Sequence, residues 1–166
     1  MKTFDIGNIE HIRESHRPNN IRILFVGESP PKIGKFFYVE SLMTTFISKP
    51  FELRFNITFN NNQDFIDFFK NKDCYLDDLC TEPVDKLPPN IRKQKLIESV
   101  KPFSKKLAEM KPLVVISILK RIEPYVVNSI ELSGIDTKFY SVPFPGFGNQ
   151  KRFKQEVLDI LNKYLP

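Results

Sequence analysis

The segment Ile21–Tyr38 constrains the fold of this chain more than any other stretch of the sequence. It opens with IRILFV, a mostly apolar and β-branched run that predicts a buried strand ending at Val26. The chain then turns abruptly into Gly27–Pro31, a polar loop stiffened by two prolines. Because loops at the carboxyl ends of parallel strands converge and bind ligands in open α/β sheets, we take Glu28 and Ser29 as the first candidate site residues.

Strand and helix patterns alternate along the rest of the chain. Strand-like apolar runs occur at 74–79, 113–119 and 138–142. Apolar residues recur at helical spacing in the intervening segments 39–49, 63–70, 90–110 and 122–130, and in a closing segment at 153–164. This alternation predicts one domain over residues 1–166, folded as a three-layer α/β/α sandwich with a central, mostly parallel four-stranded sheet.

Three segments are harder to assign from the pattern. Residues 1–20 are polar, and we expect an N-terminal extension with His11 and His16 at the surface. Proline is expected to end the helix before residue 50, and the following 51–62 suits either a short strand or an irregular loop. Pro102 predicts a kink in the long helical segment or its division into two abutting helices.

Composition narrows the classes of function. The longest apolar runs are far short of the roughly 20 residues that cross a bilayer, and the first residues lack a secretory signal, so we expect a cytoplasmic protein without a membrane partner. Two cysteines, Cys74 and Cys80, are too few for a thiolate cluster, so we expect free thiols, no metal and no cofactor. The net charge of +5 favours an anionic partner such as a nucleic acid. We expect a monomer.

The positions of the charged residues in the predicted strands and helices indicate where their side chains lie. Asp77 and Asp78 are adjacent on a predicted strand, so their side chains point to opposite faces and only one of them is expected to face a cleft. Basic residues in the long helical segment are expected to form solvated helix faces. These are Arg92, Lys93, Lys95, Lys105 and Lys106.

Three motifs together resemble the uracil-DNA glycosylase superfamily. They are GESPP-x2-G-x-FFY after the first strand, YLDDLCTEPVDKL around the second, and VPFPGFGNQKRF after the last. The first motif is similar to the GEAPG-type loop of the iron–sulfur branch, although the cluster cysteines of that branch are missing here. The resemblance covers the chain from about Ile21 to its end.

The resemblance implies a role for each matching residue. The first loop would position water and grip an extruded base through Gly27, Glu28, Ser29 and Pro30, and its backbone N–H groups up to Gly34 would stabilise the departing base. Phe36 or Phe37 would stack on the base. Asp77 matches an Asn that reads the pyrimidine edge in the family, and Phe144 stands where the family has a histidine that stabilises the departing base. The last motif would contact the DNA through Gly146, Phe147, Asn149, Lys151 and Arg152.

These implied roles predict a monofunctional DNA glycosylase that hydrolyses the N-glycosidic bond of a deaminated or damaged base, in single-stranded DNA or a damaged duplex. The alternative is a catalytically inactive nucleic-acid or nucleotide binding module on the same fold, because Phe144 cannot donate a hydrogen bond. Two residues also have structural alternatives, in which Glu28 caps a helix or turn and Phe147 packs on the closing helix. The functional hypothesis requires that the loops after the first and last strands meet over one cleft.

Overall fold

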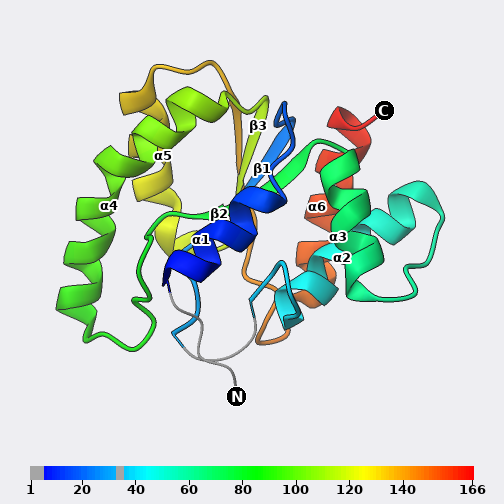
Figure 1. Ribbon diagram of the computed structural model, residues 1–166, viewed down its shortest axis with the longest axis horizontal. Helices are drawn as coiled ribbons and strands as arrows, with labels where there is room; N and C mark the ends of the chain where they lie inside the picture. Colours follow the sequence, from blue (N-terminus) through cyan, green and yellow to red (C-terminus); the bar gives the residue numbers. More distant parts are fainter. Residues whose placement is uncertain (1–5, 33–35) are drawn as a thin grey trace.

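A four-stranded parallel sheet forms the centre of the protein (Figure 1). The computed structural model describes residues 6–32 and 36–166. Its strands are β1 (Ile23–Gly27), β2 (Cys74–Asp78), β3 (Val114–Ser117) and β4 (Lys138–Ser141). They lie in the order β2-β1-β3-β4, and each neighbouring pair is parallel. The predicted three-layer α/β/α sandwich is therefore confirmed.

Helices cover both faces of the sheet. Figure 1 shows α4 (Pro89–Met110) and α5 (Glu123–Ser133) on one face. On the other face lie α2 (Leu42–Phe55), α3 (Asn62–Asn71) and α6 (Gln150–Tyr164). For the helices that connect strands, the division follows from right-handed crossovers, because the chain moves one way across the sheet from β1 to β2 and the opposite way from β2 to β3 and β4. A short 3-10 helix, η1 (Lys120–Ile122), precedes α5.

The register of β1 and β2 decides which residues meet at the carboxyl edge of the sheet. Gly27 pairs with Asp78, and Val26 pairs with Asp77. All residues of β1, β2 and β3 are buried, as expected for strands covered on both faces. Consequently, any polar side chain at the end of β2 is buried as well. None of the helices in the described residues is long and apolar enough to cross a lipid bilayer.

The outer edge of β2 is covered rather than left open. The Tyr38 hydroxyl donates a hydrogen bond to the Leu76 carbonyl at 2.8 Å and accepts one from the Leu76 N–H at 2.6 Å. Helix α1 (Ile6–Ser15) lies across this strand (Figure 1). A covered edge cannot pair with a strand of another chain, so these contacts protect β2.

Helix α1 was not predicted, because residues 1–20 read as a polar extension. Its Arg13 side chain is only 1% exposed. His11 is exposed as expected, whereas His16 is half-buried and stacks on the ring of Tyr38 with a centroid distance of 5.0 Å. Residues 1–5 lie outside the described part of the chain.

The prediction that Pro50 ends its helix is wrong, and so is the prediction that Pro102 divides the long helix in two. Helix α2 continues through Pro50 to Phe55, so residues 51–55 are neither strand nor loop. Phe51 is fully buried there, and its ring lies 5.5 Å from that of Phe65 and 5.6 Å from that of Phe69. This aromatic packing compensates for the backbone hydrogen bond that proline removes. Helix α4 likewise includes Pro102 in a single helix and not in two.

Candidate functional site

A cavity of about 520 Å³ lies at the carboxyl edge of the sheet. The loop after β1 lines it with residues 27–31, and the loop after β4 lines it with Phe144 and Phe147. The predicted meeting of these two loops over one cleft is therefore confirmed. The volume falls in the range of about 300–1,000 Å³ that is usual for small-molecule sites.

The predicted site residues divide into two groups. Those that line the cavity are Gly27, Glu28, Ser29, Pro30, Phe36, Phe37, Phe144 and Phe147. Those that do not are Asp77, Gly146, Asn149, Lys151 and Arg152. Gly34, which was also expected to contribute a backbone N–H, lies outside the described residues.

Backbone hydrogen bonds hold the loop after β1 in place. The N–H of Leu79 donates to the Gly27 carbonyl at 2.9 Å, and the N–H of Cys80 donates to the Glu28 carbonyl at 2.8 Å. The Ser29 hydroxyl oxygen accepts the N–H of Val84 at 3.2 Å. The parallel pairing of β1 and β2 thus continues into the two loops, and Ser29 is tied to the segment that follows β2.

Two arginines surround the carboxylate of Glu28. Arg92 donates to both of its oxygens, from Nη2 to Oε1 and from Nε to Oε2 at 3.2 Å. Arg121 donates from Nε to Oε2 at 3.1 Å and from Nη2 to Oε1 at 3.5 Å. A carboxylate offers about four lone-pair positions, so these four donors occupy all of them. Arg92 is therefore part of the site and not a solvated helix face. The described hydrogen bonds of the Glu28 side chain come from arginine side chains and not from the backbone N–H groups that a helix or turn cap would use.

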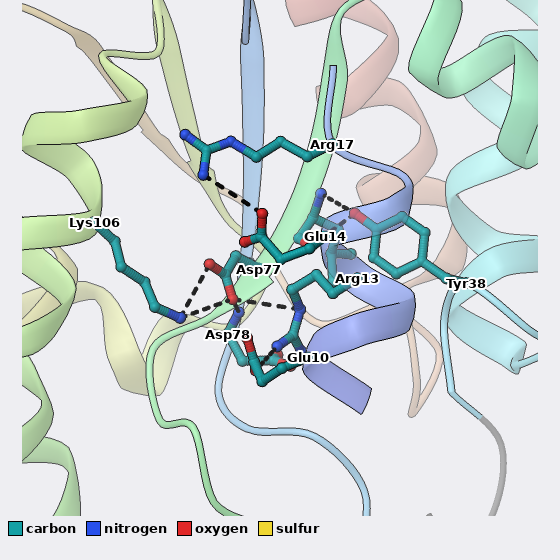
Figure 2. Close-up of polar contacts among 9 residues, drawn as sticks. Glu10, Arg13, Glu14, Arg17, Tyr38, Asp77, Asp78 and Lys106 are labelled. Atoms are coloured by element: carbon teal, nitrogen blue, oxygen red, sulfur yellow. Dashed lines mark hydrogen bonds and ion pairs between the residues drawn. The ribbon is translucent and has the colours of Figure 1, made fainter. Parts of the chain in front are cut away.

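The end of β2 contributes Asp78 to the cavity and not Asp77. Asp78 shares the orientation of its register partner Gly27, and both line the cavity. Asp77 points to the opposite face, where Lys106 of α4 donates to its Oδ2 at 3.3 Å (Figure 2). Asp77, which was predicted to read the base, therefore does not line the cavity, and Lys106 pairs with it instead of belonging to a solvated helix face.

A buried arginine from α1 connects the two aspartates (Figure 2). Arg13 Nη2 donates to Asp78 Oδ2 at 2.7 Å, and Arg13 Nε lies 3.4 Å from Asp77 Oδ1. Its Nη1 pairs with Glu10 in the same helix. Burial alone would lower the pKa of Arg13, but the charges of Asp78, Asp77 and Glu10 outweigh it and hold that pKa above its usual value. The guanidinium thus remains charged beside the two aspartates.

Burial raises the pKa of Asp78 to about 6, the nearby charge of Asp77 adds to this, and Arg13 opposes it. The Asp78 carboxyl therefore changes its charge within the range between mildly acidic and neutral pH. Gly27 is essential to its position, because a Cβ added there would lie 2.5 Å from Asp78 Oδ1. The glycine of the first motif thus leaves room for a carboxylate from the neighbouring strand.

Phe36 and Phe37 line the cavity from within the core, with side chains that are 2% and 5% exposed. The ring of Phe37 packs 5.5 Å from that of Phe69, and Phe36 packs 5.7 Å from Tyr38. These two rings form the wall of the cavity, whereas the accessible aromatic rings belong to the loop after β4.

That loop presents Phe147 to solvent. Its side chain is 99% exposed, and its backbone has a φ of 55°, in the left-handed region that side-chain-bearing residues rarely adopt. The alternative in which Phe147 packs on the closing helix is therefore wrong. Phe144 is partly exposed, and its ring lies over Gly146, where an added Cβ would be 2.8 Å from a ring carbon.

The predicted polar contacts of the last motif lie at the start of α6. Asn149 is the residue that caps α6, but its side chain makes no capping hydrogen bond. Lys151 and Arg152 are exposed in the first turn, and Arg152 Nε lies 3.5 Å from Glu156 Oε1. These side chains lie outside the cavity, within a few residues of Phe147.

Several cavity residues escaped the sequence analysis. Arg121 follows β3 and Asp85 follows β2, in loops whose meeting with the first motif depends on the sheet order. The carboxyl-end position of both loops is the signal that would have indicated them. Cys74 and Cys80 are free and buried as expected. Within residues 6–32 and 36–166, no group of three or more His, Cys, Asp or Glu side chains is arranged to hold a metal ion.

Comparison with known proteins does not assign this chain to a family. No family model matches the sequence, and no curated protein matches it. The fold and the residues around the cavity are therefore the features that indicate a function. Together they define an α/β protein with a mostly apolar cavity at the carboxyl edge of its sheet and a small set of charged groups within it.

Proposed function

We propose that the cavity takes a base extruded from DNA and that the protein hydrolyses the N-glycosidic bond of that base. One observation supports this most strongly: the loops after β1 and β4 bound one cavity, with an exposed aromatic ring on the second loop. Enzymes that act on bases in DNA need such a pocket, because the reacting atoms are inaccessible inside the duplex.

The walls of the cavity suit a flat heterocycle. Phe36, Phe37 and Phe144 provide aromatic surface, and Leu76 and Ile118 add aliphatic surface. Such walls favour a planar ring through burial of apolar area and ring stacking. The charged groups in the cavity are few, which is the usual composition of a site that orients one ligand.

Phe147 is suited to hold the duplex open while the base is in the cavity. An apolar side chain that inserts between base pairs unstacks them and kinks the DNA. Full exposure and a left-handed backbone both cost free energy, and strained residues of this kind cluster at functional sites. The exposed Lys151 and Arg152 near this ring would bind the phosphates on either side of the extruded nucleotide.

In the proposed reaction the oxygen of a water molecule bonds to C1′ of the sugar while the C1′–N bond breaks. The electron pair of that bond leaves with the base, and a proton from the water neutralises the base. Glu28 would orient the water, which requires that one of its arginine partners moves. Arg121 is the one free to do so, because its side chain is 51% exposed and a DNA phosphate offers it another anion.

A second candidate function is a binding module without catalysis. The specific observation in its favour is that four guanidinium donors occupy the Glu28 carboxylate, so no lone pair is left for water in this arrangement. Phe144 also supplies no hydrogen bond to a departing base. In this alternative the cavity would hold a base, and Glu28 would only position the two arginines.

Incision of defined oligonucleotides tests the proposal. Duplex and single-stranded oligonucleotides carrying uracil, hypoxanthine, xanthine or an oxidised base are incubated with the protein and treated with alkali, which cleaves at abasic sites. The enzyme hypothesis predicts cleavage of at least one substrate, loss of cleavage in Glu28→Gln with binding retained, and normal cleavage in Glu131→Gln, which alters an exposed carboxylate on α5. Salt-sensitive binding without cleavage of any substrate would favour the binding module.

A further inference from the structure

Asp78 is a mostly buried residue at the wall of the cavity, and one of its two carboxylate oxygens accepts no hydrogen bond from residues 6–32 or 36–166. The residue is 7% exposed and lines the cavity. Its Oδ2 accepts a hydrogen bond from Arg13 at 2.7 Å. Among the described residues, none donates a hydrogen bond to its Oδ1. Oδ1 is not among the fully buried polar atoms that lack a partner, so it is accessible from the cavity that Asp78 lines, and a donor on a ligand there could bind it.

The position of Oδ1 is tightly defined. It lies against the backbone of Gly27, where an added Cβ would come within 2.5 Å. Arg13 fixes the other oxygen, and the register of β1 and β2 fixes the backbone of Asp78. A carboxylate held on three sides in this way has little freedom to turn toward another donor.

From this geometry we propose that Asp78 selects a base that presents an N–H donor, such as an exocyclic amine, to Oδ1. This inference rests on the proposed binding of a base in the cavity. An ionised carboxylate accepts hydrogen bonds and donates none, so a carbonyl oxygen at the same place would be repelled. The group preferred at this position is therefore the exocyclic amine of a cytosine-, adenine- or guanine-type base, including a damaged base that keeps its amine, over the carbonyl that deamination leaves there.

The charges around Asp78 are consistent with a role as acceptor. Arg13 and Glu10 face it from α1, Asp77 lies beside it on β2, and Lys106 approaches from α4. The charged residues that line the cavity with it are Glu28, Asp85, Arg92 and Arg121. The two arginines of the cavity donate to Glu28, which leaves the open oxygen of Asp78 to the ligand.

Two duplexes that differ in one unpaired nucleotide test the inference directly. One carries an unpaired cytosine and the other an unpaired uracil, so that an amine replaces a carbonyl at C4. The affinity of the full chain for each duplex is measured by fluorescence anisotropy at pH 8, where the Asp78 carboxyl is ionised. A fully paired duplex is measured in the same way as the reference. We expect the cytosine duplex to bind about tenfold more tightly than the uracil duplex, the discrimination that one good contact to a base edge provides.

Asp78→Asn offers an amide N–H to the cavity in place of an oxygen, so the preference should disappear or reverse toward uracil. Asp136→Asn, an exposed substitution in the loop before β4, should leave the wild-type ratio unchanged. Equal binding of the two duplexes by the wild type would overturn the inference, even if Asp78→Asn does not fold, and so would an unchanged ratio in a folded Asp78→Asn. If neither unpaired duplex binds more tightly than the paired one, the proposed function fails together with the inference.

Discussion

Arg13 is the residue whose replacement should perturb the fold most clearly, and Arg13→Met is the change we would make. Methionine fills the apolar part of the arginine volume but removes a cation that is 1% exposed and pairs with Asp78 at 2.7 Å. Removal of one partner from a buried ion pair costs about 3–5 kcal/mol, because the remaining charge is left uncompensated. Lys106 still neutralises Asp77 in the variant, so we expect a loss near the lower end, about 3 kcal/mol.

The loss should depend on pH in a defined direction. The pKa of Asp78 is about 6 in the fold, against an ordinary value of 3.8. A raised pKa means that the folded state holds the proton more tightly, so its contribution to stability is present below about pH 4 and is lost as the pH rises through about 6. Without Arg13 this pKa rises further, and the variant should therefore lose more stability relative to wild type at pH 8 than at pH 5.

Urea denaturation of both proteins at pH 5 and pH 8, followed by circular dichroism, measures these differences. The control is Arg17→Met, which removes a partly exposed arginine 3.7 Å from Glu14 and should change the free energy of unfolding by less than about 0.5 kcal/mol. A loss in Arg13→Met below about 1 kcal/mol at pH 8, or a loss equal at the two pH values, would refute the argument that Arg13 compensates a buried carboxylate.

Three further changes test separate parts of the site. Gly27→Ala should lower the free energy of unfolding, measured by urea denaturation, by about 1–3 kcal/mol. The reason is that the added Cβ would lie 2.5 Å from Asp78 Oδ1. An unchanged denaturation midpoint would show that the carboxylate moves freely. Phe147→Gly removes the strain of a left-handed backbone, so the free energy of unfolding should stay equal or rise by up to about 1 kcal/mol. The affinity for a duplex with an unpaired base, measured by fluorescence anisotropy, should fall because the exposed ring is lost. Retained affinity would exclude the ring from binding. Lys151→Ala should reduce the slope of the logarithm of DNA affinity against the logarithm of salt concentration by about one. The control Lys101→Ala, which replaces an exposed lysine on α4, should leave this slope unchanged. Equal slopes in both variants would show that Lys151 of α6 does not contact the DNA.

The sheet could be predicted from the sequence because its strands are continuous apolar runs. Residues 23–26 and 114–116 are buried, and continuous apolar runs of this kind are typical of parallel strands that are covered on both faces. Helix α1 could not be predicted in this way, since Arg13 anchors it through charges on β2 that are distant in the sequence. Helix α2 continues past Pro50 for a related reason, because the burial of Phe51 against other aromatic rings outweighs the local preference of proline to end a helix.

The location of the candidate site could be predicted from the sequence, but the contacts within it could not. Gly27 and Glu28 follow a buried strand, and that position alone points to the carboxyl edge of the sheet. The choice between Asp77 and Asp78 depends on the register with β1, which no local pattern reveals. The partners of Glu28 come from the start of α4 and from η1, which follows β3, so their meeting depends on the sheet order.

The central claim is that a base enters the cavity between the loops after β1 and β4. Backbone amide spectra of the 15N-labelled protein, recorded while a duplex with one unpaired cytosine is added, test it most directly. The account predicts that the amide signals of Gly27, Asp78 and Ile118 shift together with those of Phe147 and Lys151, because the first three are buried residues that line the cavity, Phe147 is an exposed residue at its rim and Lys151 lies outside it. Shifts confined to Phe147, Lys151 and other exposed residues, with the interior signals unmoved at saturation, would contradict it.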